Sequence, residues 1–277
     1  MVRTITIDVP PARPRHRLRA GPAWAWASVL VAALIAAPIM AVAVTALVTP
    51  GTSFLHILTT TLPEMLANSV LLCLLVALMA GSAGAISAWL VSTCDFRGRR
   101  VLEVALLLPL AVPAYLNGYV YTWLFDVAGP AQQAFRDLTG LRYGQYWVPE
   151  IRSLPGAALM LAMVLYPYVY LMCRAAFLQQ SVCLLEASRT LGHGLPRTFL
   201  HVALPLARPA IVAGTALVLM EVLADFATVQ HFGVRTFTTG IYEAWFGMDD
   251  RAAAAQLSVG LLCCVGLLLG LEHVSRG

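Results

Sequence analysis

Two carboxylates stand four residues apart in a long apolar run: Glu221 and Asp225 are the only charged residues between positions 209 and 232. On a helix this spacing places both side chains on one face. If the run crosses a membrane, Glu221 lies near its middle, because about 12 residues, or ~18 Å, separate it from one end. Carboxylates inside a membrane are costly and often mark a transport path or gate. A structural hydrogen bond to a neighbouring helix is the alternative interpretation.

Further oxygen-bearing side chains stand in two other apolar runs, at Tyr115, Asn117 and Tyr168. Together with the carboxylates they are candidates for lining or gating a path. Phenolate and carboxylate oxygens suit a hard cation such as ferric iron. Prolines beside these residues, including Pro113, also kink helices, and packing around a kink explains polar residues equally well. The sequence therefore assigns no metal-ligand set.

Other chemistry is excluded by what the sequence lacks. All 18 basic residues are arginine, so the lysine of a phosphate-binding P-loop is missing. No H-E-x-x-H or G-x-S-x-G segment occurs, and the six cysteines form no C-x-x-C pair. We predict no catalytic residues, no bound cofactor and no ATP hydrolysis by this chain.

The elements that position these residues are predicted to be membrane spans. The chain is 60% hydrophobic and 12% charged, whereas soluble domains carry about 25% charged residues. About 20 apolar residues cross the hydrocarbon core as a helix. The sequence predicts an all-α integral membrane protein with six transmembrane helices, at about 24–48, 68–93, 104–125, 153–177, 208–232 and 252–272.

Arginine placement predicts the orientation of these spans. Residues 1–23 form an arginine-rich tail, and cytoplasmic segments of membrane proteins collect arginine. With the N-terminus inside, 13 arginines lie on the inner side and 5 on the outer side. We therefore predict a multi-pass inner-membrane protein with both termini cytoplasmic. The outer connection 126–152 contains a Gly129-Pro130 turn, which predicts a short surface helix after it.

The inner connection 178–207 is too polar for lipid and too regular for a disordered link. Its pattern predicts two short helices around a glycine turn at Gly192 and Gly194. Phe199, Val202 and Leu206 then form an apolar stripe. Such a stripe either docks in the groove of a partner or packs on the chain's own spans; the pattern leaves both open.

This connection resembles the cytoplasmic signature loop of ABC importer permeases, in which E-A-A is followed at fixed distances by G and I-x-L-P. The matching residues are Glu186, Ala187, Ser188, Gly192, Val202, Leu204 and Pro205. Ser188 and Val202 depart from the family's alanine and isoleucine. The resemblance implies that Glu186, Ala187 and Gly192 seat the loop on separate ATPase subunits, which consume the ATP.

A broader resemblance covers nearly the whole chain. The segments 94–100, 106–124, 165–177 and 217–246 are similar to the first half of the ferric-iron permeases. It implies the type I ABC importer permease fold, a transmembrane domain over 66–272, and a periplasmic binding protein as partner. It also implies a second permease half, as a separate chain, a missing C-terminal half or a second copy.

Other functions stay open beside ferric iron. Thiamine, phosphonate and polyamine permeases share the signature loop. An ion-coupled secondary transporter would use Glu221 and Asp225 as a proton relay but leaves the loop without a purpose. The expected environment is a lipid bilayer, and no nucleic-acid partner is expected.

Overall fold

The computed structural model describes residues 22–49, 51, 53–180 and 182–275, and every regular element in that part of the chain is helical. The chain divides into two compact units, residues 1–42 and 43–277, which are described separately. Most of the tail predicted over 1–23 lies outside the described residues. The uncharged helix α1 (Pro22–Val48) begins in the first unit and carries Pro38 inside it.

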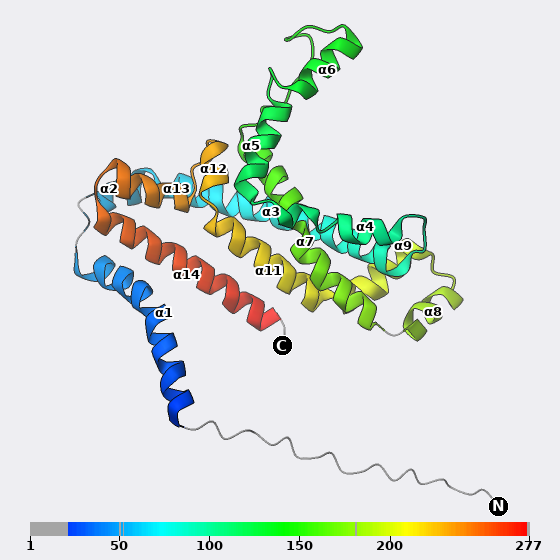
Figure 1. Cartoon of the computed structure of the whole chain (residues 1–277), viewed down its shortest axis with the longest axis horizontal. Coiled ribbons are helices and arrows are strands. Elements are labelled where there is room, and N and C mark those ends of the chain that lie inside the picture. The colour runs from blue at the N-terminus through cyan, green and yellow to red at the C-terminus, as the bar shows by residue number, and fades with distance from the viewer. Residues whose placement is uncertain (1–21, 50, 52, 181, 276–277) are drawn as a thin grey trace, which may run out of the picture. The chain divides into compact units, whose positions relative to one another are not determined.

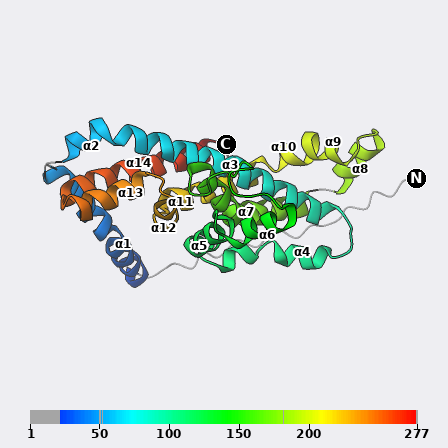
Figure 2. The same cartoon turned by 90° about the horizontal axis from the view of Figure 1, so that it is seen from above.

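Three long helices form the core of the second unit: α3 (Leu62–Thr93), α7 (Leu154–Gln179) and α11 (Arg208–Ala224). α3 and α7 run side by side (Figures 1 and 2). Two glycines allow the close approach. A Cβ at Gly84 of α3 would lie 2.7 Å from the Val169 Cβ of α7, and one at Gly214 of α11 would lie 2.7 Å from its Cα. Small residues therefore bring both helices against α7 at one point.

A smaller apolar cluster joins α14 (Arg251–Ser275) to α2 (Phe54–Thr60) and to the segment α13 (Phe237–Tyr242) with η3 (Glu243–Gly247). The Asp250 carboxylate fixes the start of α14. It accepts hydrogen bonds from the backbone N–H of Ala253 at 2.9 Å and of Ser53 at 2.8 Å. Satisfying these otherwise orphaned donors ties the start of α14 to the segment before α2.

The helix predicted over 104–125 is wrong as one continuous helix. The structure has α4 (Arg99–Ala105), η1 (Leu108–Ala111) and α5 (Ala114–Phe125). The segment Arg99–Ala111 is bent by 98° from the segment that begins at Ala114. Pro113 has no N–H to continue a helix, and Val112 before it is extended, as residues before proline tend to be. α5 consequently leaves the α3–α7 pair at a steep angle (Figure 1).

Two contacts to Glu103 hold α4 against α7. The Glu103 carboxylate pairs with the Arg174 guanidinium, and the Tyr170 hydroxyl donates to the Glu103 carbonyl at 3.3 Å. After α5 the chain forms the short helix α6 (Pro130–Thr139), at the position of the surface helix expected after Gly129-Pro130.

The helix predicted over 208–232 is also interrupted. α11 ends at Ala224, Asp225 is extended, and α12 (Ala227–His231) follows. Within the described ranges, four helices are long and apolar enough to cross a membrane, Trp24–Val48, Leu62–Thr93, Leu154–Gln179 and Arg251–Gly270. Two bent pairs raise that number to six if each pair forms one span, which is compatible with the predicted six.

Candidate functional site

The connection between α7 and α11 contains four short helical pieces, and we call residues 182–206 the elbow. They are α8 (Val182–Thr190), α9 (Leu195–Thr198), the π-helical turn η2 (Phe199–Ala203) and α10 (Leu204–Leu206). The elbow lies at one end of the α3–α7 pair, and α2 and α13 lie at the other (Figures 1 and 2).

A left-handed residue turns the chain between α8 and α9. Gly192 has φ +80°, a conformation that side chains with a Cβ adopt at a cost. Its N–H donates to the Arg189 carbonyl at 2.9 Å, and the His193 N–H donates to the Ser188 carbonyl at 3.2 Å. These bonds satisfy the last carbonyls of α8, as in other glycine-terminated helices. The predicted glycine turn is therefore located at Gly192.

A buried hydroxyl pair closes the two arms of the elbow. The Ser188 Oγ of α8 lies 3.0 Å from the Thr198 Oγ1 of α9, and both residues are buried. Ser188 Oγ also lies 3.3 Å from the His193 Nδ1 in the turn. The family's alanine could make neither bond, so the departure at Ser188 adds a polar link.

The second arm widens into a π-helical turn before its proline. The Leu204 N–H donates to the Phe199 carbonyl, five residues back. Pro205 has no N–H and its ring would crowd the preceding turn of a regular α-helix, so the wider turn accommodates it. Val202, Leu204 and Pro205 are half-buried. The Gln180 side chain donates to the Ala203 carbonyl at 3.0 Å, which fixes this arm to the end of α7.

An aromatic cluster anchors the elbow to the core. The ring of Phe199 lies 5.5 Å from that of Trp89 in α3 and 6.5 Å from that of Phe177 in α7. Trp89 and Phe177 meet edge to face at 5.5 Å and are both buried. Pairs of this geometry add about 0.5–1.5 kcal/mol beyond their apolar burial. Phe199 belongs to the predicted stripe, whereas its two partners could be found only in three dimensions.

The other face of α8 is open. Glu186 and Ala187 are exposed, and so are Gly192 and Leu191, the latter 76% exposed. An added Cβ at Gly192 would meet nothing within 4 Å. The elbow thus combines a face fixed to the core with a face that is free to contact another molecule.

The two carboxylates of the apolar run have different surroundings and do not share a helix face. Glu221 lies in α11 and is exposed. Asp225 follows the helix: its carboxylate accepts from the backbone N–H of Thr228 at 2.9 Å, the Thr228 hydroxyl at 2.7 Å and the N–H of Val229 at 3.1 Å. Asp225 therefore caps α12. The prediction that Glu221 and Asp225 share one face of a continuous helix is wrong, because α11 ends at Ala224.

The remaining path candidates are not brought together by any contact in the described residues. Asn117 donates to the Val112 carbonyl at 3.3 Å, at the bend before α5. Tyr115 is 43% exposed, and Tyr168 packs against the apolar core. Within the described ranges no group of three or more His, Cys, Asp or Glu residues could hold a metal ion.

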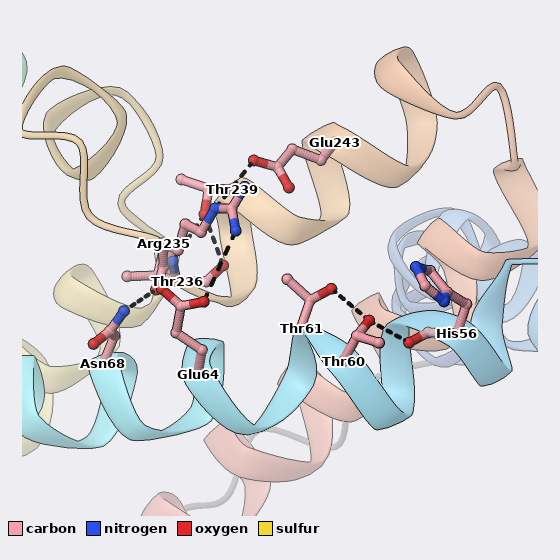
Figure 3. A network of polar contacts seen from close by, with 9 residues as sticks. All are labelled: His56, Thr60, Thr61, Glu64, Asn68, Arg235, Thr236, Thr239 and Glu243. Carbon is pink, nitrogen blue, oxygen red and sulfur yellow. Dashed lines mark hydrogen bonds and ion pairs between the residues drawn. The ribbon is translucent and has the colours of Figure 1, made fainter.

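Sequence reasoning missed a polar network at the opposite end of α3 from the elbow (Figure 3). The Arg235 guanidinium lies 3.8 Å from Glu64 and 3.9 Å from Glu243, and the Asn68 amide donates to the Arg235 carbonyl at 3.0 Å. The next residue, Thr236, caps α13. These ion pairs are about half exposed, so each contributes at most ~1 kcal/mol. Their effect is to position α13 beside the start of α3.

The fold and the elbow together define the class of this protein. The chain belongs to the family described as "Binding-protein-dependent transport system inner membrane component", whose model matches residues 80–273. The predicted resemblance to ABC importer permeases is confirmed at this level.

Two curated relatives are specific members of that class. The chain is 29% identical over 215 residues to the Fe(3+)-transport system permease protein FbpB 2 of Haemophilus influenzae, covering 77% of this chain and 38% of that protein. It is 29% identical over 203 residues to the molybdenum transport system permease protein ModB of Escherichia coli, covering 70% and 86%. The chain thus spans under half of the iron permease and most of the molybdenum permease.

A solved structure has the same fold. A chain in the crystal structure of a bacterial alginate ABC transporter, in complex with an alginate pentasaccharide-bound periplasmic protein, superposes with a TM-score of 0.73. The match covers 92% of this chain and 95% of that chain at 14% identity. The predicted all-α ABC importer permease fold is confirmed.

Proposed function

We propose that this chain is the membrane-spanning permease subunit of an ATP-driven importer. The observation that supports this most directly is the elbow, whose Phe199 packs on α3 and α7 while Glu186 and Ala187 face outward. A partner that moves the exposed face displaces two core helices with it. Docking of an amphipathic segment in a groove is a common recognition mode.

The partner at the elbow is an ABC ATPase subunit. It hydrolyses the ATP, because this chain has no P-loop. In this proposal Glu186, Ala187, Ser188, Gly192, Val202, Leu204 and Pro205 form the docking loop. The chain itself binds no cofactor and catalyses no reaction. ATP binding acts by favouring the state of the permease that the ATPase dimer contacts better.

The proposed orientation places the elbow and both termini in the cytoplasm. It rests on the excess of arginine on that side, 13 against 5. The Arg235 network and α6 then lie on the outer side, where a periplasmic binding protein delivers substrate. A second permease half completes the path, because an ATPase dimer offers two docking clefts and this chain presents one elbow.

Ferric iron is the substrate that the sequence resemblance suggests. Among the candidate path residues, Glu221 has an exposed carboxylate, and in this proposal it lines the path or its gate. Molybdate is the second candidate, because the molybdenum permease matches over 86% of its own length. An ion-coupled secondary transporter is the competing mechanism, and the elbow argues against it.

Reconstitution tests the proposal. The full chain is placed in vesicles with its candidate ATPase, binding protein and second half, and uptake of radiolabelled iron and molybdate is measured. We expect uptake that requires ATP and stops when residues 184–206 are deleted. Uptake that follows an imposed membrane potential without ATP, or an ATPase that still co-purifies with the deleted chain, would contradict it.

A further inference from the structure

The chain turns between α3 and α4 at the same end of the α3–α7 pair as the elbow (Figures 1 and 2). Residues 94–98 form this turn, and Gly98 at its end has φ +87°. A pocket of about 560 Å³ opens along the turn and the first residues of α4. Its charged lining residues are Asp95, Arg99, Arg100 and Glu103. None of them belongs to the proposed docking loop or to the path candidates.

The turn carries guanidinium groups that the fold leaves largely unused. Arg97 and Arg100 are exposed, and their side chains form no ion pair or hydrogen bond with any residue that the structure describes. Arg99 is half-buried, and its Nη2 lies 3.5 Å from the Ser92 carbonyl. A guanidinium has several N–H donors, so this one contact leaves others available.

The two carboxylates beside the turn do not cancel this charge. Glu103 pairs with the Arg174 guanidinium of α7, so its charge is already compensated. Asp95 is exposed and forms no ion pair in the described part of the chain. Three arginines of the turn against one free aspartate leave two positive charges uncompensated.

An aliphatic stripe begins directly after these charges. Val101, Val104 and Leu108 are 73%, 63% and 62% exposed, and their spacing of three and four residues places them on one side of a helix. Leu106 and Leu107 pack instead against the apolar core. Because the chain belongs to a family of inner-membrane components, an exposed aliphatic side faces the acyl chains of lipid.

The stripe leads from the turn toward the middle of the α3–α7 pair. Glu103 contacts Tyr170 and Arg174, near the elbow end of α7. Further along the chain, a Cβ at Gly118 would lie 3.4 Å from the Met160 side chain, near the other end of α7. Positive charge at the end of the helix and apolar side chains that lead into the bilayer match the two parts of a phospholipid.

We infer that the turn and this stripe bind an anionic phospholipid, with its phosphate on Arg97 and Arg100 and an acyl chain along Val101, Val104 and Leu108. Arginine matches pairs of phosphate oxygens with a fork of N–H groups. Basic clusters next to a membrane-spanning segment attract anionic headgroups. The inference goes beyond the proposed function, whose orientation serves only to place this lipid in the cytoplasmic leaflet.

Binding is measured on the purified full chain in detergent, without ATPase or ATP. Phosphatidylglycerol or phosphatidylcholine is titrated in mixed micelles, and native mass spectrometry follows the lipid bound to the chain. We expect tighter binding of phosphatidylglycerol. Arg97→Gln and Arg100→Gln should each weaken it about fivefold, the typical contribution of one arginine near a headgroup. The matched control is Arg208→Gln, an exposed arginine at the start of α11, which should stay within about twofold.

Two further variants test the opposing charge and the stripe. Asp95→Asn removes the free carboxylate and should strengthen phosphatidylglycerol binding. Leu108→Ser removes apolar contact with the acyl chain and should weaken binding severalfold. Its control is Leu262→Ser in α14, where the leucine is 52% exposed and lies outside the stripe. That control should bind as the unmodified chain does.

Three results would overturn the inference. One is equal binding of phosphatidylglycerol and phosphatidylcholine, and another is an equal loss in Arg100→Gln and Arg208→Gln. The third is inorganic phosphate that binds as tightly as phosphatidylglycerol and is unaffected by Leu108→Ser, which would make the ligand a free phosphate. ATP-driven uptake that persists alongside any of these results would leave the importer function standing, and lipid binding without such uptake would leave this site standing.

Discussion

The hydroxyl oxygens of Ser188 and Thr198 lie 3.0 Å apart inside the elbow, and neither residue is exposed to solvent by more than 5%. A buried polar pair of this kind stabilises one arrangement of the two short helices α8 and α9. If the elbow transmits motion, this pair is what makes its two arms move as one piece.

Replacing Ser188 by alanine should loosen the elbow. The change leaves the buried Thr198 hydroxyl without its partner, which costs ~1–2 kcal/mol. We expect faster hydrogen exchange across 184–206, and little change in the control Thr190→Ala, whose exposed hydroxyl bonds only to the Ala187 carbonyl. The double variant Ser188→Ala with Thr198→Val should cost less than the sum of the single changes. Strict additivity would show that the two hydroxyls are not coupled.

Phe199→Ala should separate docking from transport. The variant removes the ring that contacts Trp89 and Phe177 but leaves the outer face of α8 unchanged. We expect the ATPase still to co-purify and hydrolyse ATP while uptake falls severalfold. Leu200→Ala, at a neighbouring side chain that is 55% exposed, is the control. Normal uptake by the Phe199 variant would show that this cluster does not transmit the motion.

Gly192 should be sensitive to backbone conformation rather than to crowding within the chain. Alanine there costs ~1–2 kcal/mol because φ is +80°, and asparagine costs less. Gly194→Ala is the matched control, since its φ is −69° and the nearest atom to an added Cβ is 3.9 Å away. Thermal unfolding of the three variants tests this order. A large residue such as tryptophan at Gly192 should additionally prevent ATPase docking, visible by loss of co-purification.

Substitutions of Asp225 and of Glu221 should affect different properties, stability for the first and uptake for the second. Asp225→Ala removes the cap of α12 and should lower stability by ~1–2 kcal/mol, whereas Asp225→Asn keeps much of it. Glu221→Gln changes an exposed group and should leave stability alone but reduce uptake if that carboxylate lines the path. Unfolding midpoints and uptake are measured on the same preparations. Undiminished uptake in Glu221→Gln would remove this residue from the path.

Helix packing at Val169 gives a prediction independent of transport. Gly84→Ala places a Cβ 2.7 Å from the Val169 side chain and 2.9 Å from the Tyr166 carbonyl, so α3 and α7 must separate. Overpacking of this kind costs ~1–3 kcal/mol. Gly81→Ala, three residues earlier, has its nearest neighbour at 3.7 Å and should be tolerated. Equal thermal unfolding midpoints for Gly84→Ala and Gly81→Ala would show that α3 and α7 separate without a loss of stability.

The elbow shows what spacing alone can predict. Gly192 interrupts a helical pattern, and only a residue tolerant of positive φ ends a helix in this way, so the turn was predictable. The partners of that turn were not. Ser188 reads as a mild departure from the family pattern, yet it binds Thr198, ten residues away along the chain. Such a pairing depends on how two helices cross, which no local pattern encodes.

The two interrupted spans also show what the local sequence does not predict. Hydropathy predicts that 104–125 and 208–232 lie in an apolar environment, but it does not predict where the helix axis changes direction. Pro113 indicates a kink, but the 98° bend there depends on how the two parts pack. Asp225 fits a helix by spacing, but it is extended, because its carboxylate is used to cap α12.

The sequence by itself determined that this chain is an integral membrane protein, that it cannot bind ATP through a P-loop, and that a signature loop connects two of its apolar runs. These properties depend on composition and short-range spacing, which are written along the chain. Only the tertiary structure decided that Phe199 meets Trp89 and Phe177, and that α11 ends between Glu221 and Asp225. Those relationships join residues up to 110 positions apart, and their geometry comes from helix packing rather than from any segment alone.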